Sequence, residues 1–260
     1  MKIATFNVNS VKARLETVLD WFRNTAPDVA CLQEIKTEAK SFPTAEFEAL
    51  GYHCALLGQK TYNGVALISK FRIEDLVTGL PGEDTDEQSR YIQGVITTKT
   101  GAVRIASIYA PNGNPVDSEK YPYKLRWMDR LISHTKQLLR DEEPLVLAGD
   151  FNIIPAEQDV WDANAWKDDA LFKLESRTKL RELVNLGLTD AFRACNPKPH
   201  QYTFWDYQAG AWAKDHGIRI DHLLLSPQAA DRLTTCVIDR HMRAQEKPSD
   251  HVPIWCELNI

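Results

Sequence analysis

The chain has 260 residues, of which 43% are hydrophobic and 26% are charged, so we expect a globular protein with one domain over residues 1–260. No apolar run approaches the length of a membrane span or of a signal peptide, and five scattered cysteines lack metal-site spacing, which favours a cytoplasmic protein with reduced thiols and no membrane partner. The net charge of −5 argues only weakly against a nucleic acid partner, because a local basic stripe is sufficient for binding.

Two short apolar runs near the N-terminus, residues 2–6 and 29–32, predict buried strands. Each is closely followed by a polar side chain, Asn7 after the first run and Glu34 after the second. A carboxylate at a strand end is a candidate ligand for Mg²⁺, which prefers oxygen atoms and uses only one or two carboxylates. On position alone, a solvent-exposed Glu34 is the simpler interpretation.

The segment between these two strands is predicted to be an amphipathic helix. Apolar residues recur at helical spacing from Val11 to Phe22, and Pro27 marks the end of the pattern. Lys12 and Arg14 lie in the first turn and outside the apolar stripe. They are either solvated or in contact with phosphate.

The middle of the chain is predicted to contain several strands. They cover residues 53–57, 64–69, 91–97 and 103–108. Arg90 precedes the third of these strands, and Tyr109 follows the fourth, ahead of a Pro-Gly loop. The tyrosine hydroxyl can reach a phosphate from there, although a half-buried packing tyrosine is the more common role.

A long amphipathic helix over residues 125–139 leads to the most informative segment of the chain. Apolar residues 144–147 predict a buried strand that stops at Gly149, and Asp150 and Asn152 follow it. Because residues two apart in a strand point to the same face, these two side chains should project together and can hold a water and orient a phosphate. The alternative is an Asx turn that leaves the strand.

The C-terminal part contains a long polar loop that runs to about residue 173, an aromatic stretch at residues 201–207 and two more predicted strands. Asp221 lies on the strand over residues 219–225. Asp250 and His251 directly precede the last predicted strand, residues 252–258. Strands dominate the whole pattern, with helices between some of them, which predicts an α/β (α+β) fold with two packed sheets.

Polar side chains thus recur at the ends of the predicted strands. The set comprises Asn7, Glu34, Tyr109, Asp150, Asn152, Asp221, Asp250 and His251. Such a collection of oxygen ligands, carboxamides, a tyrosine and a histidine suits metal-assisted phosphoester hydrolysis, which needs a cation, a base for water and donors for the developing charge. The chain has no motif for a Ser or Cys nucleophile and no Gly-rich phosphate loop.

Six segments in order resemble the exonuclease III family of abasic-site endonucleases, which belongs to the endonuclease/exonuclease/phosphatase superfamily. They are FNVNS, LQEIK, IYAPNG, LAGDFN, RIDHLLLS and PSDHVPIW, and they span almost the whole chain. The resemblance implies a four-layered α/β sandwich with the site at the strand ends on one edge. It also implies a monomeric, Mg²⁺-dependent DNA repair nuclease, with Mn²⁺ as a substitute metal. The implied substrate is double-stranded DNA, cut 5′ to abasic sites or trimmed at blocked 3′ ends.

The same resemblance implies roles for individual residues. Glu34 resembles the Mg²⁺ ligand, with Asn7 beside it, and Asp250 resembles a carboxylate near the metal or at a second metal site. Asn152 and Tyr109 resemble phosphate contacts.

The implied base is not unique. Asp150 resembles the residue that orients or deprotonates the attacking water, and His251, held by Asp221, resembles the imidazole that meets the phosphate. Whether Asp150 or the His251–Asp221 pair acts as the base stays open at this point.

Substrate contacts are expected from basic and apolar residues. Lys12, Arg14 and Arg90 are the candidates for contact with the DNA backbone. An apolar pocket for a base-less sugar is expected from Phe204, Trp205, Ile218 and Ile220, although Trp205 should point away from Phe204 if the segment is extended. The alternative is that all four are core residues. Some relatives carry Trp where this chain has Ile218, which implies a looser pocket here.

Two alternatives compete with this interpretation. Sphingomyelinases, inositol-phosphate phosphatases and pancreatic-type deoxyribonucleases share the Asp-x-Asn and Ser-Asp-His segments, but the aromatic stretch and the aliphatic GIRID segment favour the repair branch. A non-catalytic DNA-binding module is disfavoured because buried polar groups without a task are costly.

Overall fold

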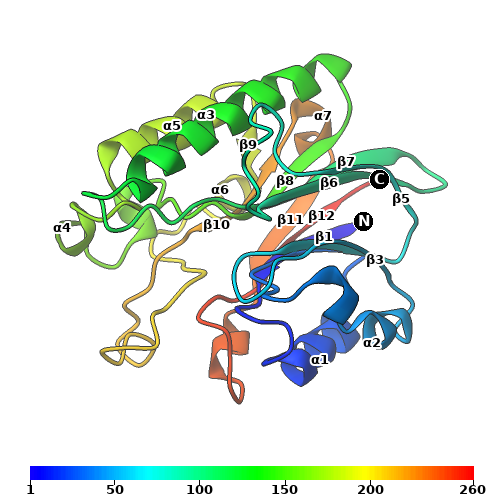
Figure 1. Cartoon of the computed structure of the whole chain (residues 1–260), viewed down its shortest axis with the longest axis horizontal. Coiled ribbons are helices and arrows are strands. Elements are labelled where there is room, and N and C mark those ends of the chain that lie inside the picture. Colours follow the sequence, from blue (N-terminus) through cyan, green and yellow to red (C-terminus); the bar gives the residue numbers. More distant parts are fainter.

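Two mixed sheets of six strands pack face to face, and helices cover the outer side of each (Figure 1). The computed structural model describes residues 1–260. The first sheet has the order β11 (Leu233–Ile238), β12 (Ile254–Leu258), β1 (Lys2–Asn7), β2 (Val29–Gln33), β4 (Val65–Ser69) and β3 (His53–Leu57). The second has the order β5 (Ile73–Thr78), β6 (Tyr91–Thr97), β7 (Ala102–Tyr109), β8 (Leu145–Asp150), β10 (Asp221–Leu225) and β9 (Thr189–Asp190).

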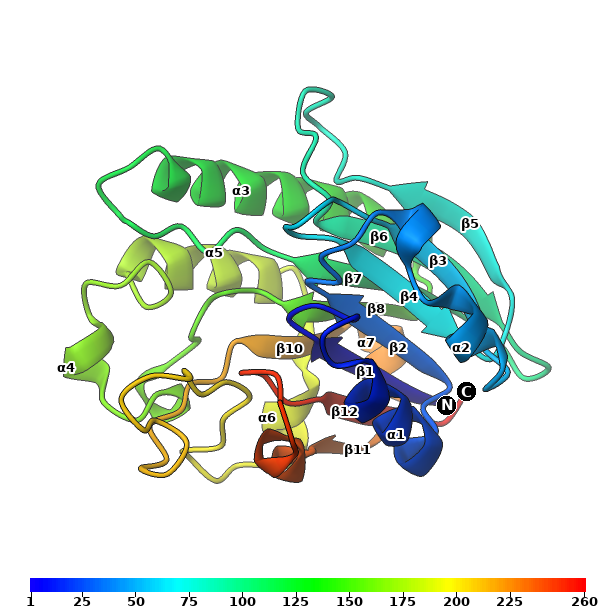
Figure 2. The same cartoon turned by 60° about the horizontal axis from the view of Figure 1, so that its bottom comes forward.

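Helices form the two outer layers, as Figure 2 shows from a second direction. The first sheet is covered by α1 (Leu15–Thr25) and α2 (Thr44–Glu48), and the second by α3 (Lys120–Leu138) and α5 (Leu174–Val184). Shorter helices are α4 (Ala163–Trp166), α6 (Ala191–Cys195) and α7 (Pro227–Ala230), with 3₁₀ turns at Ala39–Ser41, Leu139–Asp141, Glu157–Asp159 and Arg240–Ala244. None of the helices is both long and apolar enough to cross a membrane. The architecture confirms the two packed sheets that the strand pattern predicts and the four-layered α/β sandwich that the family resemblance implies.

The continuous apolar runs of the central strands follow from burial on both faces. In β1, Ile3 packs between the sheets, whereas Ala4 and Phe6 pack under α1. In β2, Cys31 faces the inner layer and Leu32 the outer one. A strand that is covered on both sides cannot alternate with polar residues, so it reads as uninterrupted hydrophobic sequence.

Several predicted boundaries shift in the structure. Strand β8 does not stop at Gly149 but includes Asp150, and a Cβ atom at Gly149 would lie 1.9 Å from the carbonyl oxygen of Ile108, so this strand position requires glycine. Strand β10 begins at Asp221 rather than at residue 219, and β12 begins at Ile254. The sequence pattern did not predict β5, β9, β11, α4, α6 or α7, which are short or lie at sheet edges.

The long loop after Asn152 is more ordered than its polar composition suggests. It contains a 3₁₀ turn and α4, and five of its buried apolar residues belong to one cluster: Ile154, Val160, Ala170, Leu171 and Phe172. This loop therefore forms a small core of its own beside the strand ends, where it can act as a rigid wall.

Candidate active site

Three predicted site residues are neighbours in one row across the second sheet. Tyr109 of β7 is the register partner of Asp150 of β8, and Asp150 is the register partner of Asp221 of β10. Each is the terminal residue of its strand at this edge. Strand pairing alone thus brings together side chains that lie up to 112 residues apart in the sequence.

The first sheet supplies Asn7 and Glu34 to the same edge. Asn7 ends β1, and its side-chain amide donates hydrogen bonds to Glu34 Oε1 at 2.9 Å and to Asp150 Oδ2 at 3.0 Å. Glu34 follows β2 with φ of 48°, a left-handed conformation that costs energy for a non-glycine residue and is typical of functional positions. One carboxamide therefore joins the carboxylates of the two sheets.

His251 lies between two carboxylates. Its Nδ1 donates a hydrogen bond to Asp221 Oδ2 at 2.8 Å, and its Nε2 lies 3.7 Å from Asp150 Oδ2, within ion-pair distance but beyond a hydrogen bond. The ring of Phe204 packs edge-on against the imidazole, with centroids 4.9 Å apart. The imidazole is thereby fixed in orientation, with Nε2 directed toward Asp150.

Asn152 is used for positioning more than the sequence suggested. Its backbone N–H donates to Asp150 Oδ1 at 2.8 Å, and its side-chain amide donates to the carbonyl of Ala110 at 2.9 Å and to Asp150 Oδ2 at 3.3 Å. Its side-chain oxygen accepts from Asn112 at 3.2 Å. Asn152 lies beyond the end of β8 with φ of 50°, and its N–H contact with Asp150 Oδ1 is the Asx turn that was the alternative to a continuing strand. This turn brings the two side chains together, while Phe151 packs in the opposite direction.

Lys124 is a site residue that the sequence analysis missed. It is fully buried in α3, and its ammonium group donates to the carbonyls of Asn112 at 2.9 Å and Asn152 at 2.6 Å. It therefore links the two loops that follow β7 and β8. The available signal was its place on the buried face of α3, four residues before Met128 and seven before Leu131.

A pocket of about 280 Å³ opens at this edge. Phe204 and Ile220 form part of its wall, as predicted, together with Trp166, Leu171 and Asp169 from the long loop. The polar residues that line it are Glu34, Tyr109, Asn112, Asn114, Asp150, Asn152, Asp206, Asp250 and His251. The structure thus gathers the predicted polar set, apart from Asn7 and Asp221, directly around one cavity.

Two of the predicted pocket residues lie elsewhere. Trp205 is fully buried in the core under the first sheet, and its indole N–H donates to Asp215. Ile218 is fully buried next to Phe204 but does not line the pocket. Phe204 and Trp205 point oppositely, so only the first can reach a ligand.

Comparison with known proteins agrees with this geometry. The family model described as "Endonuclease/Exonuclease/phosphatase family" matches residues 4–251. The chain belongs to the endonuclease/exonuclease/phosphatase family. Exodeoxyribonuclease III of Haemophilus influenzae is 34% identical to this family member, over 99% of this chain and 100% of the relative.

Solved structures of the family superimpose closely on this member. An AP endonuclease from Archaeoglobus fulgidus matches with a TM-score of 0.95 and 37% identity, covering 100% of both chains. A variant of the 3′ phosphatase NExo from Neisseria, solved with a product DNA hairpin, matches with a TM-score of 0.96 and 38% identity, again over 100% of both chains. DNA repair nuclease APEX1 of Danio rerio is 30% identical over 100% of this chain and 83% of its own length.

Burial and charge set the protonation of the central groups in this family member. Burial alone would lower the pKa of His251, but the carboxylates of Asp221 and Asp150 outweigh it and raise that pKa to about 10. Burial raises the pKa of Asp150, and the imidazolium of His251 opposes this. Burial, Glu34 and Asp150 raise the pKa of Tyr109 well above its usual range, so its hydroxyl stays protonated and can donate.

The carboxylates fit a hard divalent cation. Single ligand atoms of Glu34, Asp150 and His251 lie within 4.8 Å of one another. His251 is an imidazolium whose Nδ1 is engaged by Asp221, so oxygen atoms of Glu34 and Asp150 are the donors that suit Mg²⁺. Burial would raise the pKa of Glu34, but hydrogen bonds from Lys36 and Asn7 outweigh it and lower that pKa, which keeps this carboxylate ionised.

The other two expected metal residues do not add a ligand to this cluster. The side-chain oxygen of Asn7 accepts from the backbone N–H of Asn9 at 3.0 Å, and its amide N–H groups face the carboxylates. Asp250 lines the pocket but lies outside the cluster, and its Oδ1 accepts from Asn9 Nδ2 at 3.0 Å. In this geometry both residues position the surrounding loops.

The three candidate DNA-backbone contacts, Lys12, Arg14 and Arg90, differ in the contacts that they make within the chain. Arg14 donates to the carbonyl of Pro248 at 3.1 Å and to the hydroxyl of Tyr207 at 2.8 Å, and Arg90 lies over the ring of Tyr109 at 4.8 Å. Lys12 is exposed and makes no hydrogen bond or ion pair within the chain. Of the three, Lys12 is the one that is free to meet a phosphate.

Proposed function

We propose that this chain is a Mg²⁺-dependent DNA repair nuclease that hydrolyses phosphodiesters 5′ to abasic sites and at 3′ ends of double-stranded DNA and also removes blocking groups such as phosphate from 3′ ends, with Mn²⁺ as a substitute metal. It acts as a cytoplasmic monomer. The observation that carries the proposal is the continuous chain of contacts from Glu34 through Asn7 and Asp150 to His251 and Asp221. Relatives named as exodeoxyribonuclease III, AP endonuclease and 3′ phosphatase support the choice of substrate.

The residues divide the chemical work among themselves. Mg²⁺, when bound by Glu34 and Asp150, would neutralise charge on the phosphate oxygens. Asp150 orients the attacking water or takes its proton, since its carboxylate is held by Asn7 and Asn152 and faces the pocket. His251, fixed as an imidazolium by Asp221, supplies a positive donor to the phosphate.

This assignment favours Asp150 over the His251–Asp221 pair as the base. An imidazole whose pKa is about 10 is already protonated at neutral pH and cannot accept a proton there. Asp150 keeps its carboxylate within the site, beside the metal-binding Glu34. The Tyr109 hydroxyl adds a second neutral donor from the neighbouring strand.

The deciding experiment is a cleavage assay on a duplex that carries a single abasic site, together with a duplex that carries a 3′-terminal phosphate. Activity on both is expected with Mg²⁺ and is expected to vanish in excess chelator. Asp150→Asn serves as the matched control, because it keeps the side-chain shape and should lose at least ~10²-fold in turnover while DNA binding persists. Undiminished cleavage in chelator would contradict the proposal.

Glu34→Gln tests the metal ligand separately. It removes one carboxylate charge and leaves the hydrogen bond from Asn7 intact, so the fold is retained and the Mg²⁺ concentration for half-maximal cleavage should rise by ~10-fold or more. A titration of cleavage rate against Mg²⁺ measures this. An unchanged Mg²⁺ requirement would remove Glu34 from the metal site.

A further inference from the structure

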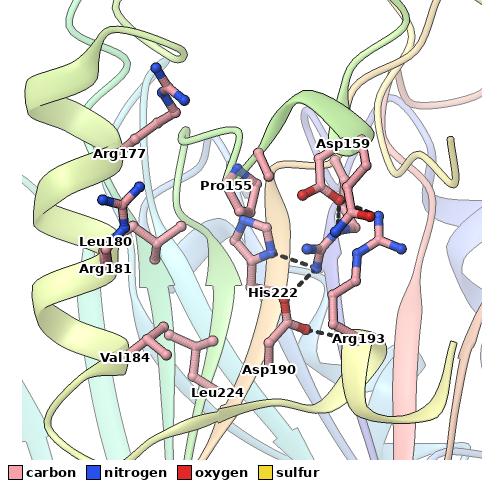
Figure 3. Close-up of a pocket in the computed structure, with 13 residues that line it drawn as sticks. Pro155, Asp159, Arg177, Leu180, Arg181, Val184, Asp190, Arg193, His222 and Leu224 are labelled. Carbon is pink, nitrogen blue, oxygen red and sulfur yellow. Dashed lines mark hydrogen bonds and ion pairs between the residues drawn. The ribbon is translucent and has the colours of Figure 1, made fainter. Parts of the chain in front are cut away.

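A second pocket, of about 240 Å³, lies on the outer face of the second sheet, between α5, α6 and the loop that follows β8 (Figure 3). Strand β10 separates it from the active site. Asp221 faces His251, whereas the next residue, His222, faces this second pocket, because successive residues of a strand point to opposite sides. The proposed nuclease reaction uses none of the residues that line it.

Positive charge is in excess in this pocket. Its charged lining residues are Arg177, Arg181, Arg193, Arg219, Asp159 and Asp190. Arg219 donates from Nε to Asp159 at 2.7 Å and from Nη1 to Asp190 at 2.8 Å, and Arg193 also contacts Asp159. Arg177 and Arg181 have no carboxylate partner, so two guanidinium charges are uncompensated.

His222 adds no charge to this balance. Burial and the nearby Arg219 lower its pKa, so it is neutral. Its Nδ1 accepts a hydrogen bond from Arg219 at 3.1 Å, and its Nε2 therefore carries the hydrogen and donates to the carbonyl of Ile153 at 3.0 Å. The pocket therefore keeps a net excess of two positive charges.

Buried polar atoms of three residues that line the pocket have unused hydrogen-bonding capacity. Arg219 is 0% exposed, and its Nη2 has no partner within the chain. Arg193 Nε and Asp159 Oδ2 are also buried without a partner. Buried polar atoms are rarely left unsatisfied, so two donors and one acceptor here await a ligand or water.

We propose that this second pocket binds a small oxyanion of the phosphate class. Arg177 and Arg181 on α5 stand on one side of the cavity and Arg193 on α6 on the other, as Figure 3 shows. Arg177 Nε also donates to the carbonyl of Phe172, and Arg193 Nη1 donates to the carbonyls of Asn196 and Lys198, whereas Arg181 makes no hydrogen bond within the chain. Guanidinium groups bind phosphate oxygens with good geometry. Hydrogen phosphate also carries an O–H that can donate to Asp159, which sulfate cannot do. The expected preference is phosphate over sulfate.

The test uses inorganic phosphate as the probe, titrated calorimetrically into the metal-free protein at an ionic strength held constant with chloride. Arg177→Gln/Arg181→Gln should bind phosphate at least about tenfold more weakly than the unmodified chain, because charge-assisted hydrogen bonds are lost. The control is Lys173→Gln/Lys179→Gln, which removes two charges from α5 and its N-cap outside the pocket and should bind normally. Equal phosphate affinity in all three proteins, or no measurable binding, would overturn the proposal.

Further measurements separate the source of the anion from the site itself. If the pocket variant also binds duplex DNA less tightly with a shallower salt dependence, the natural occupant is a backbone phosphate; if DNA binding is unchanged, it is a free anion. Arg181→Gln alone repeats the test with an exposed residue that makes no hydrogen bond within the chain, in case the double variant melts at lower temperature. Sulfate binding as tight as phosphate binding would remove Asp159 from the recognition.

Discussion

At the scale of single residues, the geometry of the candidate site depends on a few groups that contact two partners each. Asn7 contacts Glu34 and Asp150, Asn152 contacts both Asp150 and the loop after β7, and His251 lies between two carboxylates. Such side chains tolerate little change, because each substitution disturbs two contacts at once.

The Asp221–His251 pair gives a pH-dependent prediction for the metal-free protein. The folded chain holds His251 protonated up to about pH 10, whereas a histidine in the unfolded chain loses its proton near its ordinary pKa of about 6.5. The stabilisation is therefore fully present below about pH 6.5 and declines as the pH rises to 10. Asp221→Asn should lower the free energy of unfolding more at about pH 6 than at about pH 10.

Urea unfolding in chelator at the two pH values measures this difference. Asp231→Asn is a suitable control, because that carboxylate follows α7 and makes no ion pair. An equal loss at both pH values would mean that Asp221 does not hold His251 in its charged form.

Lys124 yields a second prediction at this scale. Lys124→Met keeps the aliphatic stem but removes the donor shared by the carbonyls of Asn112 and Asn152. Two buried carbonyls then lose a partner, so we expect a stability loss of about 1–3 kcal/mol and a fall in kcat that exceeds the change in KM.

Lys120→Met, on an exposed position one turn earlier in α3, is the matched control. Thermal melting and steady-state cleavage on the same preparations distinguish the two effects. A Lys124 variant with a normal kcat would show that the two loops keep their geometry without this link.

At the scale of elements, the pocket wall combines a loop, an extended segment and a strand end. Trp166 and Leu171 come from the long loop after β8, Phe204 from the aromatic stretch, and Ile220 from the residue before β10. Because every nucleotide presents the same phosphate, these wall residues cannot select a substrate by its phosphate. They can select it by admitting or excluding the adjacent sugar.

Phe204→Ala should therefore weaken cleavage at abasic sites more than removal of nucleotides from a 3′ end, by roughly tenfold in kcat/KM for the first reaction relative to the second. Phe204→Leu retains an apolar wall, so its relative loss of abasic-site cleavage should lie between those of the unmodified chain and Phe204→Ala. Because Phe204 also packs on His251, both activities and the melting temperature need to be measured together. An equal loss of both activities would make Phe204 a packing residue.

The elements differ in how well the sequence predicts them. Buried strands such as β1, β2 and β8 were predictable because both faces are apolar, and their polar ends identified most of the site. Edge strands such as β5 and β9 were not predictable, because neither has a hydrophobic pattern. Strand β5 is largely exposed, and β9 has only two residues. Lys124 and the loop residue Trp166 were missed because their roles arise from tertiary contacts that local periodicity does not record.

At the scale of the whole molecule, a chain of net charge −5 must present its positive groups locally in order to bind DNA. Arg14 and Arg90 are partly engaged within the chain, so their substitution would affect structure as well as binding. Lys12→Gln should make the dependence of log Kd on log salt shallower by about one unit with no change in melting temperature.

The control for this measurement is Lys70→Gln, which follows β4 at the opposite edge of the first sheet and pairs with Asp28. Its salt dependence should equal that of the unmodified chain. An unchanged slope for Lys12→Gln would place the backbone contact on other residues.

The pairing of β1 with β12 has a consequence for the time course of synthesis. Asn7 is made well before His251, which lies just ahead of the strand that pairs beside β1. A ribosome must therefore deliver the segment past His251 before the imidazole and its two carboxylates can meet. Every shorter nascent chain lacks this group, so the candidate site cannot be complete in any folding intermediate that forms before His251 is available.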